Sequence, residues 1–186
     1  NEQCRKMVHR TFEQLLRMKV VPIVNENDVI SMDELAYGVI GDNDTLAAYV
    51  TELVGADLLI MMSDIDGLYT DDPNKNQSAR FIHTVSKIDE NLEHMAKGSS
   101  TDLGTGGMET KINAAKIATS AGADMVIANG KSIYTINDIV NGKKVGTLFL
   151  AKEHANGVEN EISSERPQYR RAAKRAKKSG TCKKQQ

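Results

Sequence analysis

The sequence predicts an α/β protein with a three-layer αβα arrangement, in which helices cover both faces of a mostly parallel central sheet. Short apolar runs of strand length alternate with longer segments of helical periodicity, which is the pattern of βαβ units. Hydrophobic residues make up 40% of the chain and aromatic residues only 4%, so the core must be aliphatic. The chain has 186 residues, enough for one domain with a core but not comfortably for two.

The chain is expected to begin with a helix followed by a strand. Residues 2–18 carry apolar side chains on one helical stripe, namely Met7, Val8, Phe12, Leu15 and Leu16. Residues 20–24 (VVPIV) form a short apolar run rich in β-branched side chains, which predicts a buried strand. We therefore expect this run to lie inside the sheet.

The same alternation continues through the body of the chain. The expected helices cover residues 42–55, 88–97, 108–121 and 136–140, and the expected strands cover residues 57–62, 81–85, 125–128 and 147–150. The strand at 81–85 is expected at an edge of the sheet. Gly55 is expected to end its helix, because glycine readily adopts the left-handed conformation there. Residues 69–73 (YTDDP) are typical of a turn.

Charge divides the chain into a body, residues 1–150, and a linker with a basic tail, residues 151–186. From Arg166 onward there are basic side chains and no acidic ones, whereas 25 acidic side chains lie before that point. An acidic body argues against nucleic acid as the main ligand, except through the tail. We expect the tail to be disordered.

Cysteine usage and hydropathy favour a cytoplasmic protein. Cys4 and Cys182 lie at opposite ends of the chain without metal-like spacing, which is typical of free thiols in a reducing compartment. No apolar run approaches the roughly 20 residues that a membrane-spanning helix needs. The first residues also lack the apolar stretch and cleavage site of a signal peptide.

Polar clusters follow three of the expected strands. They are residues 25–28 (NEND), Ser63-Asp64 and Asn129-Gly130. Ligands of open parallel sheets gather beyond the carboxyl ends of the strands. These clusters therefore predict a functional pocket at that edge.

The segment 104–111 (GTGGMETK) is the sharpest local signal. Glycines allow the backbone to approach a phosphate closely, and the N–H groups at a helix start favour anions. Lys111 would lie near the start of the following helix, where a cation opposes the helix dipole unless an anion is near. The segment does not match the Walker pattern. A flexible loop capping a helix, with Lys111 merely exposed, explains the spacing equally well.

The triplet Asp42-Asn43-Asp44 opens an expected helix. Asp and Asn are good N-cap residues, and that role alone accounts for one of the three. Two polar side chains are then left for another purpose.

Taken together, these motifs resemble the amino-acid kinase family. The matching stretches are VPIVNENDVI (21–30), GDNDTLAAYV (41–50), MMSDIDGLYTDDP (61–73), GTGGMETK (104–111), IANG (127–130) and KKVGTLF (143–149). They occur in the family's order over residues 10–150. The resemblance implies the amino-acid kinase fold with its N-terminal part missing. On this basis, we expect residues 1–150 to form a partial kinase domain that binds the nucleotide.

The resemblance implies transfer of the ATP γ-phosphoryl group, with Mg²⁺, to the side-chain carboxylate of glutamate, in the first step of proline synthesis. It also implies that the full-length parent is a homo-oligomer. No residue of this chain is expected to be a metal ligand. The implied site residues are Asp28, Asn43 and Asn25 for glutamate; Ser63, Asp64, Thr105, Gly106, Gly107, Met108, Glu109, Thr110 and Lys111 for the nucleotide; and Lys111 with Asp44 for catalysis. Asp44 would fix the lysine through an ion pair.

Because the family's opening segment has no counterpart here, we expect this chain alone to bind ATP weakly and to be inactive. Two alternatives stay open at this point. The parent could be a family member that acts on acetylglutamate or on uridylate. The chain could also be a non-catalytic, nucleotide-binding regulatory fragment.

Overall fold

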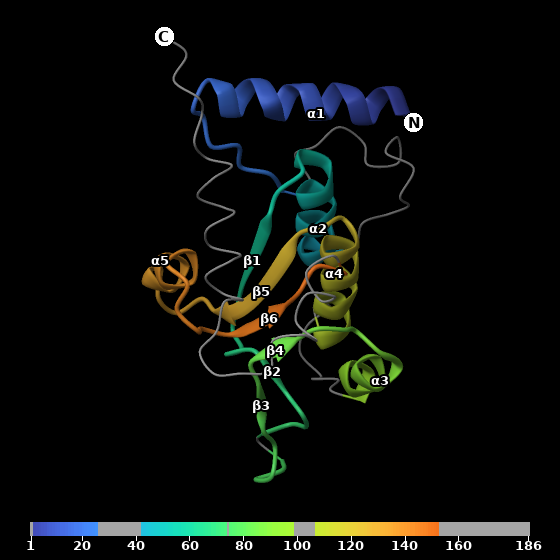
Figure 1. The fold of residues 1–186 in the computed structure, drawn as a ribbon, viewed down its shortest axis with the longest axis vertical. Helices are drawn as coiled ribbons and strands as arrows, with labels where there is room; N and C mark the ends of the chain where they lie inside the picture. Colours follow the sequence, from blue (N-terminus) through green and yellow to red (C-terminus); the bar gives the residue numbers. More distant parts are fainter. Residues whose placement is uncertain (1, 26–41, 74, 99–106, 153–186) are drawn as a thin grey trace.

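The computed structural model describes residues 2–25, 42–73, 75–98 and 107–152 (Figure 1). The helices in these ranges are α1 (Glu2–Arg17), α2 (Asn43–Val54), α3 (Glu90–Gly98), α4 (Met108–Ser120) and α5 (Tyr134–Val140). The strands are β1 (Leu58–Ser63), β2 (Leu68–Tyr69), β3 (Phe81–Ile82), β4 (Thr84–Val85), β5 (Asp124–Asn129) and β6 (Thr147–Phe149). None of the helices described is long and apolar enough to span a membrane.

The main sheet has the strand order β1-β5-β6-β4. Strands β1 and β5 run parallel, with Leu58 opposite Asp124 and Ser63 opposite Asn129. Strands β4 and β6 are also parallel, whereas β5 and β6 are antiparallel. The sheet is therefore mixed but mostly parallel, as predicted. Strands β2 and β3 form a separate antiparallel pair.

Strand β5 lies at the centre and sends alternate side chains into two cores. Met125 and Ile127 pack in the cluster that includes Ala48 of α2 and Ile112 of α4. The side chain of Val126 packs instead with α5. Helices thus cover opposite faces of the sheet, which gives the expected three layers (Figure 1). Each large apolar side chain buried in this way contributes about 1.5–3 kcal/mol.

The buried face of helix α4 includes three alanines, which favour close packing on the sheet. Ala114, Ala115 and Ala118 are fully buried. Small side chains let a helix axis come near the strands and its neighbouring helix. This close packing fixes the position of the residues at the start of α4.

Helix α2 begins and ends as the sequence predicts. The Asp42 carboxylate accepts hydrogen bonds from the Thr45 backbone N–H at 2.7 Å and from the Thr45 hydroxyl at 2.9 Å. Gly55 ends the helix in the left-handed conformation, with φ of 61°. Asp42 is therefore the N-cap, and Asp44 is left in the first turn for another role.

The buried strand predicted at residues 20–24 is wrong. Residues 20–25 form no strand, and the side chains of Val21 and Ile23 are 82% and 94% exposed. The chain instead turns back at the end of α1, where Lys19 has φ of 59° and the Val20 N–H donates to the Leu15 carbonyl at 2.9 Å. Apolar composition permits a strand, but the strand also needs a hydrogen-bonding neighbour.

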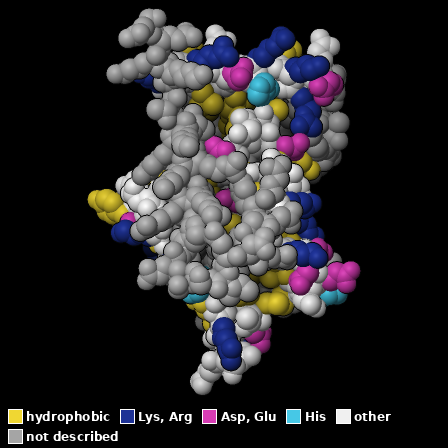
Figure 2. Space-filling model, viewed as in Figure 1, with side chains coloured by type: hydrophobic (Ala, Val, Ile, Leu, Met, Phe, Trp, Pro, Cys, Tyr) yellow, Lys and Arg dark blue, Asp and Glu magenta, His cyan; other side chains and the backbone are white. Residues whose placement is uncertain are grey.

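The apolar stripe of α1 is narrower than predicted. Val8, Phe12 and Leu15 are half-buried, but Met7 and Leu16 are 56% and 54% exposed. Among the described elements, the helix makes its main contact with α2, so one narrow face is covered. Charged side chains gather over α1 on the outer surface, at the top of Figure 2. Helical periodicity locates a stripe but does not determine how wide the covered part is.

The single strand expected at 81–85 is two short strands in different sheets, β3 and β4. Strand β2 also covers Tyr69, which the sequence placed in a turn. The Thr147 hydroxyl accepts from the Leu68 N–H at 2.8 Å and donates to the Ile82 carbonyl at 2.6 Å. This buried hydroxyl joins β6 to the small sheet, a long-range contact that local patterns do not reveal.

The expected linker and tail fall almost wholly on residues 153–186, outside the described part of the chain. The division into 1–150 and 151–186 therefore stays a prediction.

Candidate functional site

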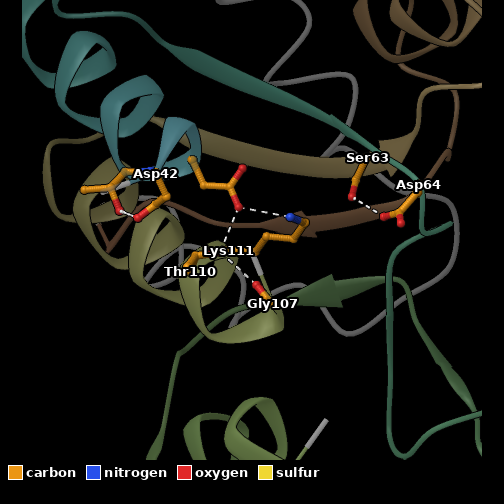
Figure 3. Close-up of polar contacts among 8 residues, drawn as sticks. Asp42, Ser63, Asp64, Gly107, Thr110 and Lys111 are labelled. Atoms are coloured by element: carbon orange, nitrogen blue, oxygen red, sulfur yellow. Dashed lines mark hydrogen bonds and ion pairs between the residues drawn. The ribbon is translucent and has the colours of Figure 1, made fainter. Parts of the chain in front are cut away.

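Helices α2 and α4 bring together two charged side chains. The Lys111 Nζ lies 3.0 Å from the Asp44 Oδ2, and these side chains are only 10% and 20% exposed (Figure 3). A lysine is rarely buried to this extent unless a charge is paired with it. The ion pair expected between these residues is present.

A hydroxyl group joins this ion pair to the backbone before α4. The Thr110 Oγ1 lies 2.8 Å from the Asp44 Oδ2 and 2.8 Å from the Gly107 carbonyl oxygen. Its single proton can be donated to either acceptor. Asp44 Oδ2 thus has two neighbours that can donate to it, Lys111 and Thr110, which fixes how this carboxylate is turned.

Among the described residues, none caps the start of α4. Gly107 is the N-cap in an extended conformation, and no side chain in the described ranges hydrogen-bonds to the helix there. A Cβ at Gly107 would meet no described atom within 4 Å. The N–H groups of the first helical turn have no partner inside the helix, and they attract negative charge. Lys111 adds a positive charge at the same end.

The residues Asp44, Thr110 and Lys111 form a first polar corner of the candidate site. A second polar corner, made of Ser63, Asp64 and Asn129, lies at the carboxyl ends of β1 and β5. Ser63 and Asn129 are register partners, and the Gly130 N–H donates to the Ser63 carbonyl at 2.7 Å. The Ser63 hydroxyl donates to the Asp64 Oδ1 at 3.1 Å. Two of the three predicted polar strand ends therefore do meet at one edge.

The amide of Asn129 joins the two strand ends. Its Nδ2 donates to the Asp66 Oδ1 at 2.8 Å and to the Asp64 carbonyl at 3.3 Å. Its Oδ1 accepts from the Lys131 N–H at 2.9 Å. The sequence marked Asn129 only as part of a polar strand end and missed these contacts, because they depend on the strand order.

The remaining predicted residues lie elsewhere or outside the described part of the chain. Asn43 is the exposed first residue of α2, and Asn25 is half-buried at the end of a described range. Asp28, Thr105 and Gly106 lie outside the described residues. Met108 is half-buried and Glu109 exposed in the first turn of α4.

No group of three or more His, Cys, Asp or Glu side chains that could hold a metal ion occurs within residues 2–25, 42–73, 75–98 and 107–152.

Comparison with known proteins gives the class of protein to which this fold and site belong. The sequence profile of the Amino acid kinase family matches residues 1–129. The chain belongs to this family.

Curated relatives carry the name glutamate 5-kinase. The chain is 55% identical to the glutamate 5-kinase of Clostridium tetani over 141 residues, covering 76% of this chain and 52% of that protein. It is 47% identical to the glutamate 5-kinase of Clostridium perfringens over 154 residues, covering 82% of this chain and 57% of that protein. The chain thus spans about half the length of these relatives.

A solved uridylate kinase from Archaeoglobus fulgidus is 19% identical, with a TM-score of 0.46 over 74% of this chain and 66% of that one. This likeness is too distant to bear on the substrate.

Proposed function

We propose that this chain forms the nucleotide-holding part of a kinase that transfers the γ-phosphoryl group of ATP to the side-chain carboxylate of glutamate. The product is glutamyl 5-phosphate, and the reaction is the first step of proline synthesis. The observation that carries the proposal is the largely buried ion pair of Lys111 and Asp44, which lies in the first turns of α4 and α2. The names of the relatives support glutamate as the acceptor.

The chemistry explains why a lysine would be placed there. A carboxylate that attacks a phosphate brings two anions together, so the protein must supply alignment and positive charge. No general base is needed, since a carboxylate is ionised at pH 7. Lys111 would stabilise the charge on the transferring group, an effect typically worth about 3–4 kcal/mol for a well-placed donor. Asp44 and Thr110 would hold the ammonium in place.

The nucleotide would lie between the two polar corners. The stretch 105–111 would receive the phosphates on the N–H groups at the start of α4. The side chains of Ser63 and Asp64 would contact the nucleotide from the carboxyl end of β1. Gly107 supports this arrangement, because no described atom lies within 4 Å of the position that a Cβ would take there.

Glutamate would be held by polar side chains that precede and open α2. Asn25, Asp28 and Asn43 are the candidates for this role. Asn43 is next to Asp44 in the chain, so a substrate bound there would be near the Lys111 ammonium. The exposure of Asn43 leaves its amide available to a ligand.

Mg²⁺ would be held mainly by the phosphates of ATP, because this ion usually takes one or two protein carboxylates and keeps several waters. Asp44, whose Oδ2 faces Lys111 and Thr110, would instead hold the lysine. When bound, Mg²⁺ would reduce the negative charge that the glutamate carboxylate meets.

The proposal is tested by measuring ADP release with a coupled assay, using the longest natural protein that contains this chain. Turnover should depend on glutamate and should be absent with acetylglutamate or UMP in its place. Preference for either of the other acceptors would replace glutamate with that substrate. ATP binding without any turnover would indicate a regulatory nucleotide-binding protein. The homo-oligomeric state of the parent stays a prediction.

A further inference from the structure

We propose that Asn129 is a positioning residue of the nucleotide site, which holds the turn of residues 63–66 in the shape that presents Ser63 and Asp64 to the nucleotide. This inference rests on the proposed function, because it concerns the same site. Asn129 itself would not touch the reacting atoms.

The contacts of Asn129 use both functions of its amide. The Nδ2 group donates to Asp66 and to the carbonyl of Asp64, and the Oδ1 accepts from the Lys131 N–H. A carboxylate could not replace the amide, because it would face a carboxylate and a carbonyl with no proton to donate. A shorter or apolar side chain would remove all these bonds.

Within the described part of the chain, the turn is held from the solvent side mainly by Asn129. Asp64 and Asp66 are exposed, and Ile65 between them is half-buried against the core. The Gly130 N–H fixes the strand ends by donating to the Ser63 carbonyl, but this bond stops at residue 63. The amide of Asn129 holds the next part of the turn, because it donates to the Asp64 carbonyl and to the Asp66 carboxylate.

The position of Asn129 makes this role specific. It is the last residue of β5 and the register partner of Ser63, the last residue of β1. Any shift of the turn would move the Ser63 hydroxyl and the Asp64 carboxylate, which also contact each other. A change at residue 129 should therefore alter nucleotide affinity more than it alters the sheet, where backbone bonds hold the strands.

The test measures the dissociation constant of Mg-ATP by titration calorimetry on the longest natural protein that contains this chain, with the thermal midpoint recorded for each variant. Asn129→Asp loses the two hydrogen bonds donated by Nδ2, and Asn129→Leu loses all three bonds of the amide. Each variant should weaken ATP binding by about tenfold or more. The apolar variant shows that the loss does not come from added negative charge. Asn137→Asp is the matched control, since Asn137 is exposed on α5, and it should bind within about twofold of the original chain.

A double variant that exchanges the amide of residue 129 with the carboxylate of residue 66 gives the decisive measurement of ATP affinity. In the double variant Asn129→Asp with Asp66→Asn, an amide at 66 can donate to a carboxylate at 129, and the net charge equals that of the original chain. We expect it to recover most of the lost affinity.

Equal ATP affinity in the folded original chain and in both single variants would overturn the inference, as would a double variant no better than Asn129→Asp. If the unsubstituted natural protein bound no ATP at all, the proposed function itself would fail, and this inference with it.

Discussion

The two polar corners of the candidate site are built on different physical principles. At the start of α4, an ion pair is shielded from water, with Lys111 only 10% exposed. At the carboxyl ends of β1 and β5, the neutral amide of Asn129 donates to the exposed Asp66 carboxylate and to the backbone carbonyl of Asp64. A buried charge depends strongly on its partner, whereas an exposed network loses only the bonds that are removed. The first corner should therefore be far more sensitive to single substitutions.

Substitution of Lys111 should have the largest effect. Lys111→Met keeps the length of the side chain but removes its charge at the point where phosphoryl charge would develop. We expect turnover to fall by about 10²–10³-fold, as for loss of one well-placed electrostatic donor. The measurement is glutamate-dependent ADP release by the natural protein that contains this chain.

Lys116→Met is the matched control on the same helix, because the ion pair of Lys116 with Glu93 is more exposed, at 38% and 36%. The control should change turnover less than about threefold. Similar losses in the two variants would contradict a special role for Lys111.

Removal of the Asp44 charge should mainly affect stability. Asp44→Asn leaves the shielded ammonium facing a neutral amide, and we expect the free energy of unfolding to fall by about 2–3 kcal/mol, below the full value for a completely buried pair. Urea denaturation of the chain measures this change. Glu52→Gln, which breaks the α1–α2 ion pair of Arg5 with both side chains 34% exposed, should cost less than about 1 kcal/mol. Equal costs would remove the contrast between shielded and exposed pairs.

The hydroxyl of Thr110 offers a finer test of the shielded corner. Thr110→Val keeps the shape of the side chain but removes the hydrogen bond to Asp44 or Gly107, and should cost about 1 kcal/mol. Thr110→Ser retains the hydroxyl and should recover most of that loss. Urea midpoints of the two variants make the comparison. A serine variant as unstable as the valine variant would show that the methyl group, not the hydroxyl, matters.

A substitution at Gly107 should change ATP affinity more than it changes thermal stability. Because a Cβ there meets no described atom within 4 Å and the backbone is extended, Gly107→Ala should lower the thermal midpoint only slightly, as Ala is a poorer N-cap than Gly. If phosphates approach this position closely, the added methyl group should weaken ATP binding by about three- to tenfold. Calorimetric titration with Mg-ATP measures the affinity. Unchanged affinity would place the phosphates away from the start of α4.

The smallest effect concerns a carboxylate outside both corners, in the turn between β2 and β3. Hydrogen bonds from the Asn76 side chain and from the Asp72 N–H, together with the charge of Lys75, lower the pKa of Asp71. The turn is therefore favoured above the usual carboxylate pKa of about 4, and this contribution is lost as the pH falls through the lowered value.

Chemical-shift titration of the backbone amides in this turn checks that prediction. In Asn76→Ala, the midpoint of Asp71 should move upward toward its usual value, since the largest cause of the shift is removed. An unchanged midpoint would show that the Asn76 bond does not hold the turn in solution.

Local patterns predicted most of the elements correctly. The caps of α2 follow from Asp42 and Gly55, and the strand β5 follows from an apolar run of suitable length. These features depend on neighbours in the chain, so sequence is enough to find them. Residues 20–24 have the same apolar character as a buried strand, yet Val21 and Ile23 are exposed. Whether these residues form a strand depends on a hydrogen-bonding strand beside them. The local sequence pattern carries no information about such a neighbour.

By itself, the sequence determined the chemistry that this protein can present: an aliphatic α/β core, a glycine-led helix start with Lys111, and acids at the head of α2. Only the tertiary structure decided which of these groups meet. Asp44 and Lys111 are 67 positions apart in the chain but touch, and Asn129 reaches Asp66 across 63 positions, because the packing of α2 on α4 and of β1 beside β5 brings them together. Contacts of this kind arise from burial of the shared core, which acts on the whole chain at once.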